Sequence, residues 1–452
     1  MRINKLSSAL AIVGLCTISG AALATNGYFS HGYGIKAKGM GGAATAMSID
    51  AMGGANNPAS MVWVGNRLDF GVDYFRPIRT AKREGSQGGA NDFNQDSDTN
   101  NFFIPEFGYN KMLGNNLSLG VSVYGNGGLN TDYNGNTNTP AGCTGGQNPS
   151  TARTQNALCG SGQLGVNLEQ LIIAPTLAYK INDKHSIGIS PLIGYQRFKA
   201  NGLGAFSQIS NDPSNLTNET RTGDRESDDA WGLGVRIGWQ GKITDTVTLG
   251  AAYASKVYMQ KFDKYRGLFA EQGDFDIPEN FNVGVAWKAM PSLTLALDYQ
   301  RINYSGVAAV SNSSQQAGCT PNPPAGPANS PNCLGGSNGI GFGWQSIDVW
   351  KLGVEFQASK ALTLRAGYNK GDNPIRSQDV TFNILATGVV TDHATLGMTY
   401  AVSPNAELTV SYMHAFEKST SGRTNPTYFN VGGTETIKMK QDSLGVAYSL
   451  KF

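Results

Sequence analysis

The side chains of this chain that could do chemistry are few and scattered. The four histidines, His31, His185, His393 and His414, have no convincing serine and acid partners of the kind that nucleophilic catalysis requires. The five cysteines match no zinc-binding spacing. The other candidates are ionisable side chains that share one parity of alternating segments: Asp69, Asp73, Glu106, Arg236, Asp298, Lys351, Glu355 and Arg365. The sequence therefore favours neither an enzyme nor a metal centre, and no cofactor is expected.

These charged residues lie in segments where apolar and polar side chains alternate. In RLDFGVDYF, which begins at Arg67, every second residue is apolar, and a period of two predicts a β-strand with one apolar face. Fourteen such segments follow one another: 67–75, 102–109, 117–123, 168–179, 185–195, 231–239, 246–253, 281–287, 292–299, 350–356, 361–368, 394–400, 406–412 and 442–452. The side chains of the opposite parity are mostly small, polar or charged.

The connections between the segments alternate in length. Six are tight turns: LGN, IND, KITD, KAMP, ASK and VSPN. The other seven are long: 80–100, 126–165, 201–229, 263–273, 306–343, 371–390 and 418–434. Strict alternation of short and long connections with an even number of strands is typical of outer-membrane barrels. The sequence therefore predicts an all-β fold, a 14-stranded antiparallel transmembrane β-barrel over residues 66–452, with its apolar face toward lipid.

Aromatic residues mark the two edges of the expected apolar band. Trp231 and Trp239 share one parity, and eight residues at ~3.3 Å each, tilted by ~40°, separate them by roughly 20 Å along the membrane normal. Trp287 falls at the inner edge, and Trp344 with Trp350 toward the outer edge. The chain ends on an aromatic residue, which the barrel-insertion machinery would recognise. Outer-membrane lipid and lipopolysaccharide are the expected surroundings of a Gram-negative outer-membrane protein.

The first 24 residues read as a signal peptide. Basic residues precede an apolar run, and Ala22-Leu23-Ala24 provides a small-residue cleavage site, so the mature chain is expected to begin at Thr25. The 35 basic residues, less the two in the signal, then equal the 33 acidic residues. A formal charge of zero argues against nucleic acid as a partner.

Four cysteines remain after cleavage, and they form two couples that are each local in sequence. Cys143 with Cys159, and Cys319 with Cys333, lie in stretches rich in Gly, Pro, Asn and Ser. In an oxidising compartment this arrangement predicts two disulfides that staple loops.

Residues 25–65 do not alternate. Their many glycines disfavour a long helix, and they offer few bulky side chains for a separate core. A barrel of fourteen strands is too wide for wall side chains to fill, so we expect this segment to lie inside the barrel as an N-terminal hatch. Gly53 and Gly54 would permit tight bends, and Asn57-Pro58 would start a turn. A disordered periplasmic leader of the same composition is the alternative.

The same stretch, NGYFSHGYGIKAKGMGGAATAMSIDAMGGANNPASM, resembles the hatch of the FadL family of outer-membrane long-chain fatty acid and hydrophobic compound transporters. Two further stretches, SLGVSVYGNGGLNTDY and LIIAPTLAYKINDKHSIGISPLIGYQRF, resemble the same family. The resemblance implies passive uptake of hydrophobic molecules, with lateral release beside a kinked third strand when the hatch shifts. It assigns the hatch plug to Asn57, Pro58 and Ala59, the mobile N-terminus to Thr25, Asn26, Gly27, Tyr28 and Phe29, and the kink to Gly125, Asn126, Gly127 and Gly128.

Three prolines give separate support to a side exit. Pro105, Pro175 and Pro191 interrupt the second, fourth and fifth predicted strands. Proline cannot donate to a strand ladder and usually marks an edge or a bulge. A locally weakened wall is one interpretation, and three unrelated bulges are the other.

The charged residues of the lumen leave the substrate open. A solvated, mutually paired interior is the ordinary interpretation, whereas Arg236, Lys351 or Arg365 could bind the carboxylate of a fatty acid. An aromatic hydrocarbon would require none of them. We therefore expect a monomeric channel for long-chain fatty acids, with aromatic hydrocarbons as the next candidate and a polar-solute porin as the competitor from another class. Adhesion through the long loops is a further alternative.

Overall fold

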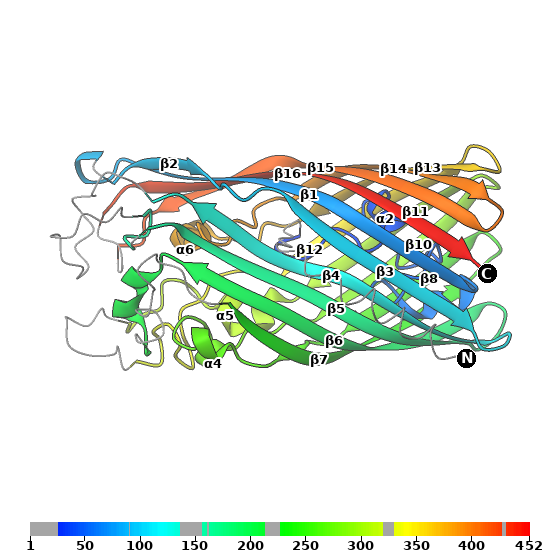
Figure 1. Cartoon of the computed structure of the whole chain (residues 1–452), viewed down its shortest axis with the longest axis horizontal. Helices are drawn as coiled ribbons and strands as arrows, with labels where there is room; N and C mark the ends of the chain where they lie inside the picture. Colours follow the sequence, from blue (N-terminus) through cyan, green and yellow to red (C-terminus); the bar gives the residue numbers. More distant parts are fainter. Residues whose placement is uncertain are drawn as a thin grey trace, which may run out of the picture.

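The computed structural model describes residues 26–89, 91–135, 156–160, 162–212, 227–319, 330–426 and 431–452. In these residues the chain forms a closed antiparallel barrel (Figure 1). Of the sixteen strands, β2 (Phe93–Asp96) and β9 (Tyr258–Met259) are short additions beside β1 and β7. No helix in the described ranges is long and apolar enough to cross a membrane.

The other fourteen strands form the wall, and β16 pairs with β1 to close it. They are β1 (Arg67–Glu84), β3 (Phe102–Met112), β4 (Leu117–Tyr133), β5 (Leu164–Lys180), β6 (His185–Asn201), β7 (Asp228–Lys242), β8 (Val247–Ala254), β10 (Asn280–Met290), β11 (Leu293–Ile302), β12 (Ile347–Gln357), β13 (Leu362–Gly371), β14 (Asp392–Ser403), β15 (Ala406–Arg423) and β16 (Thr434–Lys451). Each of the fourteen alternating segments in the sequence lies in one of these strands, which confirms the predicted strand count.

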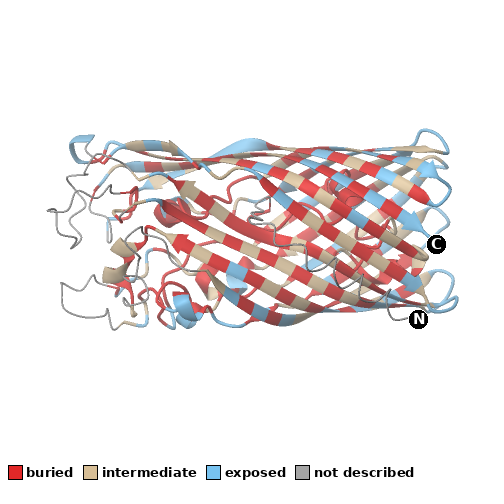
Figure 2. Ribbon diagram, viewed as in Figure 1, coloured by how far each residue is buried: buried red, intermediate tan, exposed pale blue. Residues whose placement is uncertain are grey.

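The burial of side chains follows the period of two along each strand (Figure 2). In β16 the outward side chains of Leu444, Val446 and Tyr448 are 39–47% exposed, whereas Ser443, on the opposite parity, is 3% exposed. The outward face is rich in large apolar residues, and the inward face carries small, polar and charged ones. This is the arrangement that the alternating sequence predicts for a barrel with an apolar exterior.

All six short connections lie at one end of the barrel, together with the start of β1 and the end of β16 (Figure 1). We call this the turn end, and the opposite end, where the long connections gather, the loop end. The loops carry short helices: η2 (Gln87–Gly89), η3 (Gly204–Ile209), η4 (Asp263–Tyr265), α4 (Ala270–Gly273), η5 (Tyr304–Gly306), α5 (Ala308–Ser311), η6 (Ser377–Asp379) and α6 (Val380–Asn383). Of these, η3, η4, η5, α5 and α6 contribute side chains to a shared apolar core.

The N-terminal segment, residues 26–66, fills the lumen. It contains only two short helices, α2 (Ile35–Lys38) and η1 (Pro58–Trp63). A side chain at Gly41 would collide with the backbone of Tyr368 in β13, and Thr45 lies against Gly250 of β8. Residues 26–47 are all buried. Small residues are used here because the backbone of the segment runs in direct contact with several strands of the wall.

Two expectations about single residues have different outcomes. Cys319 and Cys333 form a disulfide, whereas Cys143 lies outside the described residues, as do Thr25 and the expected signal peptide. The placement of Trp344 at the outer aromatic edge is wrong. Trp344 is 1% exposed and packs among the loops, where its indole Nε1 donates to Asn383 Oδ1 at 2.6 Å.

Candidate functional site

The wall is interrupted beside β4. The pairing of β3 with β4 runs from Met112 opposite Ser118 to Glu106 opposite Tyr124, and the rest of β4 pairs only with β5. Pro105 still pairs with Val72 of β1, but it is the first residue of β3, next to Glu106, that has no partner in β4. A proline has no N–H for the ladder, which explains an end at this position.

The strands next to β4 are also locally irregular. The register between β4 and β5 shifts between Gly125 and Gly127, within the segment expected to be the kink. Between β5 and β6 the pairing passes from Ile173 opposite Ile193 to Leu177 opposite Ile189. The unpaired stretch contains Pro175 and Pro191. Two interruptions therefore flank the part of the wall formed by β4 and β5.

The N-terminal segment takes the place of β3 along the unpaired part of β4. Gly128 N donates to Tyr28 O at 3.1 Å, Ser30 N donates to Asn126 O at 3.2 Å, and Phe29 forms an antiparallel bridge with Gly127. Tyr33 Oη donates to Asn126 O at 3.0 Å. A Cβ at Gly127 would lie 1.9 Å from Tyr28 O, so only glycine permits this approach. The segment thus closes, from the inside, the gap between β3 and β4.

One loop tyrosine holds the same segment from the other side. Tyr304, in η5, accepts hydrogen bonds at its Oη from Tyr28 N at 3.1 Å and Phe29 N at 3.3 Å. It donates to Asn26 O at 2.5 Å. The rings of Tyr28, Tyr304 and Trp344 pack with centroids 5.1–5.7 Å apart. The loops and the segment that closes the gap are therefore joined through a single hydroxyl and an aromatic cluster.

A small apolar cavity of about 20 Å³ lies under the loops. Its walls contain no charged residue: Val166, Phe198, Phe206, Leu268, Phe269, Ala309, Leu334, Ile340, Gly341, Phe342, Phe382 and Leu385. This volume is close to that needed for one water molecule, so a larger ligand would have to separate the loops. Phe269 also packs on Phe275, which packs on Tyr28, with centroids 4.9 and 6.2 Å apart. An apolar path therefore runs from the loops toward the gap.

The three cations that could have met a substrate carboxylate lie away from this cavity. Arg236 Nη1 donates to the carbonyl oxygens of Gly54, at 2.8 Å, and Ala55, both in the N-terminal segment. Arg365 donates to Glu355 Oε2 at 2.9 Å and to Thr399 Oγ1 at 2.6 Å. Lys351 is 6% exposed and lies across the β11–β12 pair from Asp298.

Acidic residues of the wall bind the N-terminal segment and do not pair only with basic residues of the wall. Asp298 Oδ2 accepts from Ala44 N and Thr45 N, each at 2.8 Å. Glu106 Oε1 accepts from Ile35 N at 2.8 Å, and Asp73 pairs with Lys38 at 2.6 Å. The interpretation of the lumen charges as a solvated, mutually paired interior is therefore wrong for Asp73, Glu106 and Asp298. Arg365 and Glu355 do pair with each other, at 2.8 Å. Periodicity placed them on the inner face but gave no signal for their partners.

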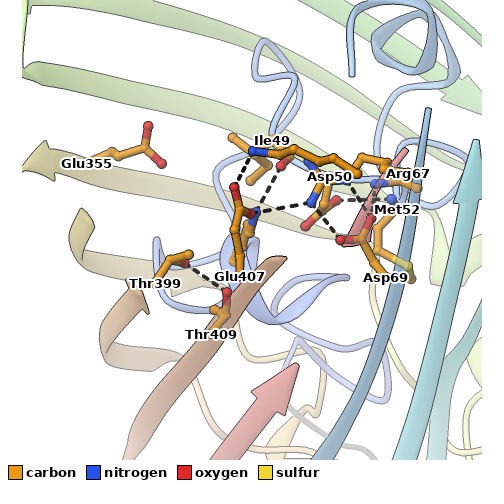
Figure 3. A network of polar contacts seen from close by, with 12 residues as sticks. Ile49, Asp50, Met52, Arg67, Asp69, Glu355, Thr399, Glu407 and Thr409 are labelled. Atoms are coloured by element: carbon orange, nitrogen blue, oxygen red, sulfur yellow. Dashed lines mark hydrogen bonds and ion pairs between the residues drawn. The ribbon is translucent and has the colours of Figure 1, made fainter. Parts of the chain in front are cut away.

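A second anchor lies near the turn end. Lys36 Nζ is 2.6 Å from Glu407 Oε2, and Arg67 Nη2 is 3.7 Å from the same oxygen. Arg67 also pairs with Asp69, at 2.7 Å, and Asp69 Oδ2 accepts from Ala51 N at 2.8 Å (Figure 3). Burial lowers the pKa of Lys36, although Glu407 opposes this shift. The ion pairs therefore offset part of the cost of burying a charge.

The Asn57-Pro58-Ala59 triplet fastens the segment to β6 and β7. Asn57 caps η1, since its Oδ1 accepts from Ala59 N at 3.1 Å and Pro58 occupies the first helical position. Asn57 Nδ2 donates to Thr45 O at 2.8 Å and to Trp239 O at 2.9 Å. Ala59 O accepts from Ser186 Oγ at 2.9 Å. The triplet is an anchored turn against β6 and β7, whereas the residues beside the unpaired part of β4 are Tyr28, Phe29 and Ser30.

His31 adds no positive charge to the lumen at neutral pH. Burial, with His393, Lys38 and Lys351 nearby, holds the pKa of His31 well below its ordinary value. Its ring stacks on His393 with centroids 6.0 Å apart.

The family model for outer membrane protein transport proteins (OMPP1/FadL/TodX) matches residues 16–452. Comparison with curated protein sequences gives no match.

Solved structures of transporters share the fold at low identity. The toluene transporter TodX of P. putida has a TM-score of 0.65 and 18% identity, over 93% of this chain and 99% of that one. A FadL homologue of Pseudomonas aeruginosa has a TM-score of 0.67 and 16% identity, over 94% and 100% of the two chains. The toluene transporter TbuX of Ralstonia pickettii has a TM-score of 0.60 and 19% identity, over 93% and 99%.

The family model covers nearly the whole chain, including the N-terminal segment and all fourteen wall strands. The chain belongs to the OMPP1/FadL/TodX family of outer membrane transport proteins.

Proposed function

We propose that this protein takes up uncharged hydrophobic compounds, with small aromatic hydrocarbons as the substrate class, and releases them sideways through the gap between β3 and β4. Residues 25–65 act as the hatch, and Asn26 to Phe29 as its mobile part. The observation that carries the proposal is the pairing of Tyr28–Ser30 with Asn126–Gly128 where β3 is missing. Withdrawal of this short segment would open the wall without unfolding a strand.

The substrate class is supported by the apolar cavity and the aromatic path below it. A fatty acid would carry its carboxylate into a site whose lining has no cation to bind it, at a cost in desolvation. Aromatic rings favour flat apolar ligands through offset and edge contacts. The toluene transporters named above share this fold, which agrees with the proposal.

Long-chain fatty acids remain the second candidate because of Lys351. This buried lysine makes no hydrogen bond or ion pair within the described residues, so its ammonium could meet a carboxylate in the lumen. A fatty acid route would therefore depend on Lys351, whereas a hydrocarbon route would not.

Uptake by whole cells separates the candidates. Gram-negative cells that lack their own channel of this kind would express the protein, or its Lys351→Gln variant, and receive labelled toluene, oleate or a disaccharide. We expect uptake of toluene that Lys351→Gln leaves unchanged. Uptake of oleate that Lys351→Gln abolishes would establish the fatty acid route instead. Uptake of the disaccharide alone would refute a hydrophobic channel and leave a porin.

A further inference from the structure

Six outward-facing tyrosines repeat one contact around the barrel. Each lies on a strand that runs toward the loop end and donates its hydroxyl to a side chain of the neighbouring strand that returns from that end. Five of the six acceptors lie at or just before the start of that strand, whereas Asp442 lies in the middle of β16. The six donor–acceptor pairs are Tyr74 with Asn101 at 2.6 Å, Tyr195 with Asp229 at 2.8 Å, Tyr253 with Glu279 at 2.7 Å, Tyr299 with Asp348 at 2.8 Å, Tyr368 with Asp392 at 2.6 Å and Tyr412 with Asp442 at 2.7 Å. Five of the six acceptors are carboxylates.

Most of these tyrosines are followed, two residues on, by a basic side chain on the same outward face. These are Arg76, Arg197, Arg301, Lys370 and His414. Four of them approach the carboxylate of the same pair: Arg197 to Asp229 at 3.9 Å, Arg301 to Asp348 at 2.7 Å, Lys370 to Asp392 at 3.9 Å and His414 to Asp442 at 2.9 Å. We call this set of tyrosines, acids and bases the outer ring.

The outer ring marks the boundary of the apolar exterior. On the turn-end side of each tyrosine the outward side chains are apolar, as with Leu295 and Leu297 before Tyr299, or Leu408 and Val410 before Tyr412. On the loop-end side further bases follow, including Lys418, Lys438 and Lys440. Lipid chains that cover the apolar face would therefore bring their headgroups to the level of the outer ring.

The charges of the outer ring are arranged to offer donors outward. Each of the five carboxylates accepts a hydrogen bond from a tyrosine, and four of them also lie within 4.0 Å of a basic nitrogen of the outer ring. The basic side chains remain open to the surroundings: Arg301 is 41%, Arg197 51% and Lys370 68% exposed. A guanidinium has five N–H donors, and a carboxylate that occupies one edge leaves the others for an anion.

We propose that the outer ring is a docking surface for the phosphorylated glycolipid of the outer leaflet, a lipid of the diphosphoryl lipid A type. Its phosphates contact Arg197, Arg301 and Lys370, and its acyl chains lie on the apolar face below. Phosphate and guanidinium form strong charge-assisted hydrogen bonds. Three successive hairpins carry the bases Arg301, Lys370 and His414, so one headgroup with two phosphates can meet more than one of them. The inference rests on the placement of the protein in the outer membrane.

The ring has one break. The β4–β5 hairpin has no such tyrosine contact, and its outward residues at this level are Asn130, Asn167 and Glu169. This hairpin borders the gap between β3 and β4. The outer ring would therefore hold no headgroup beside the proposed exit.

The test uses the full-length protein in phosphatidylcholine nanodiscs that contain diphosphoryl lipid A, monophosphoryl lipid A or neither. Native mass spectrometry after release into detergent counts the lipids retained by each protein. A triple variant of the outer ring, Arg197→Gln, Arg301→Gln and Lys370→Gln, is compared with a matched triple variant at the turn end, Lys111→Gln, Lys288→Gln and Lys360→Gln. All three control lysines are exposed.

We expect the ring variant to retain diphosphoryl lipid A on the order of tenfold less than the wild type, because each exposed charge pair contributes a fraction of a tenfold factor. The turn-end variant should match the wild type, and monophosphoryl lipid A should bind more weakly to both. Equal retention by the ring variant and the wild type would overturn the inference, as would equal loss of phosphatidylcholine.

Heat-modifiable migration in gels verifies that each variant is folded. Toluene uptake is measured separately, so failure of the transport proposal would be seen on its own.

Discussion

The substitution Gly127→Ala tests whether the N-terminal segment closes the wall. The added Cβ would lie 1.9 Å from Tyr28 O, whereas real Cβ atoms essentially never approach within 3.0 Å. The segment must therefore move by about 1 Å or more, and the hydrogen bonds of Gly128 N to Tyr28 O and of Ser30 N to Asn126 O are lost or weakened. At ~1 kcal/mol for each bond, the closed state loses about 2 kcal/mol, or roughly a 30-fold shift in the equilibrium between closed and open.

Hydrogen–deuterium exchange of residues 26–33 reports this equilibrium directly, because opening exposes their amides. Gly127→Ala should speed their exchange by roughly 30-fold and raise toluene uptake. The matched control is Gly306→Ala, whose Cβ would meet its nearest atom at 3.4 Å, an ordinary contact. If Gly127→Ala and Gly306→Ala exchange and transport alike, the segment does not gate the gap and the reasoning fails.

Two further substitutions test the supports of the same segment, and a third tests a carboxyl group in the β9–β10 loop. Tyr304→Phe removes the hydroxyl that bonds Asn26, Tyr28 and Phe29, and should make the N-terminus sensitive to limited proteolysis. The control Tyr258→Phe, at an exposed tyrosine, should leave the cleavage pattern unchanged, and equal patterns for the two variants would contradict the prediction. Glu407→Gln leaves the Lys36 ammonium buried without its carboxylate and should lower the free energy of unfolding by ~3–5 kcal/mol, as measured by denaturant melts. The control Glu417→Gln, in the exposed pair with Lys438, should lower it by less than ~1 kcal/mol. Similar losses for both variants would refute the anchoring role. Burial, with Asp276 and Glu271 nearby, raises the pKa of Asp274 in the β9–β10 loop to about 6. The protonated carboxyl is therefore favoured in the fold, so protection of residues 274–277 from hydrogen exchange should be greatest below about pH 4, fall as the pH rises through 6, and become less pH-dependent in Asp274→Asn. An unchanged profile in that variant would assign the effect to another group.

The strands were predictable from sequence because each carries its own signal. A period of two in side-chain polarity survives wherever one face meets an apolar surface and the other a lumen, so all fourteen segments could be found singly. The tight turns could also be predicted, because a few adjacent residues are enough to identify each of them. Trp344 shows the limit of this approach: an aromatic residue close to a strand resembles a girdle residue until the path of the loop is known, and here the loop turns it inward.

The contacts of the candidate site could not be predicted because they depend on how a non-periodic segment crosses the lumen. The glycines at 125–128 indicated an irregular β4, but nothing in them named Tyr28 as the group that approaches. The wall acids were placed inward correctly, yet Asp298 binds backbone N–H groups of Ala44 and Thr45, which have no sequence signature. For five of the six tyrosines of the outer ring a basic residue follows two positions on, and this repeat is visible in the sequence. The acids that the tyrosines bind belong to neighbouring strands, so the contacts themselves could not be predicted.

The buried position of the N-terminus bears on the order of leader cleavage and barrel assembly. Asn26 is 1% exposed, and its carbonyl accepts from Tyr304 deep inside the barrel, close behind the expected cleavage site at Ala24. A chain that still carried its leader would have to thread some two dozen more residues through a filled lumen to reach the same position. If residues 1–24 are the leader that the sequence predicts, its removal is expected to precede the binding of residues 26–30 beside β4. A precursor that kept the leader would then be expected to form its wall while the gap between β3 and β4 stays uncovered.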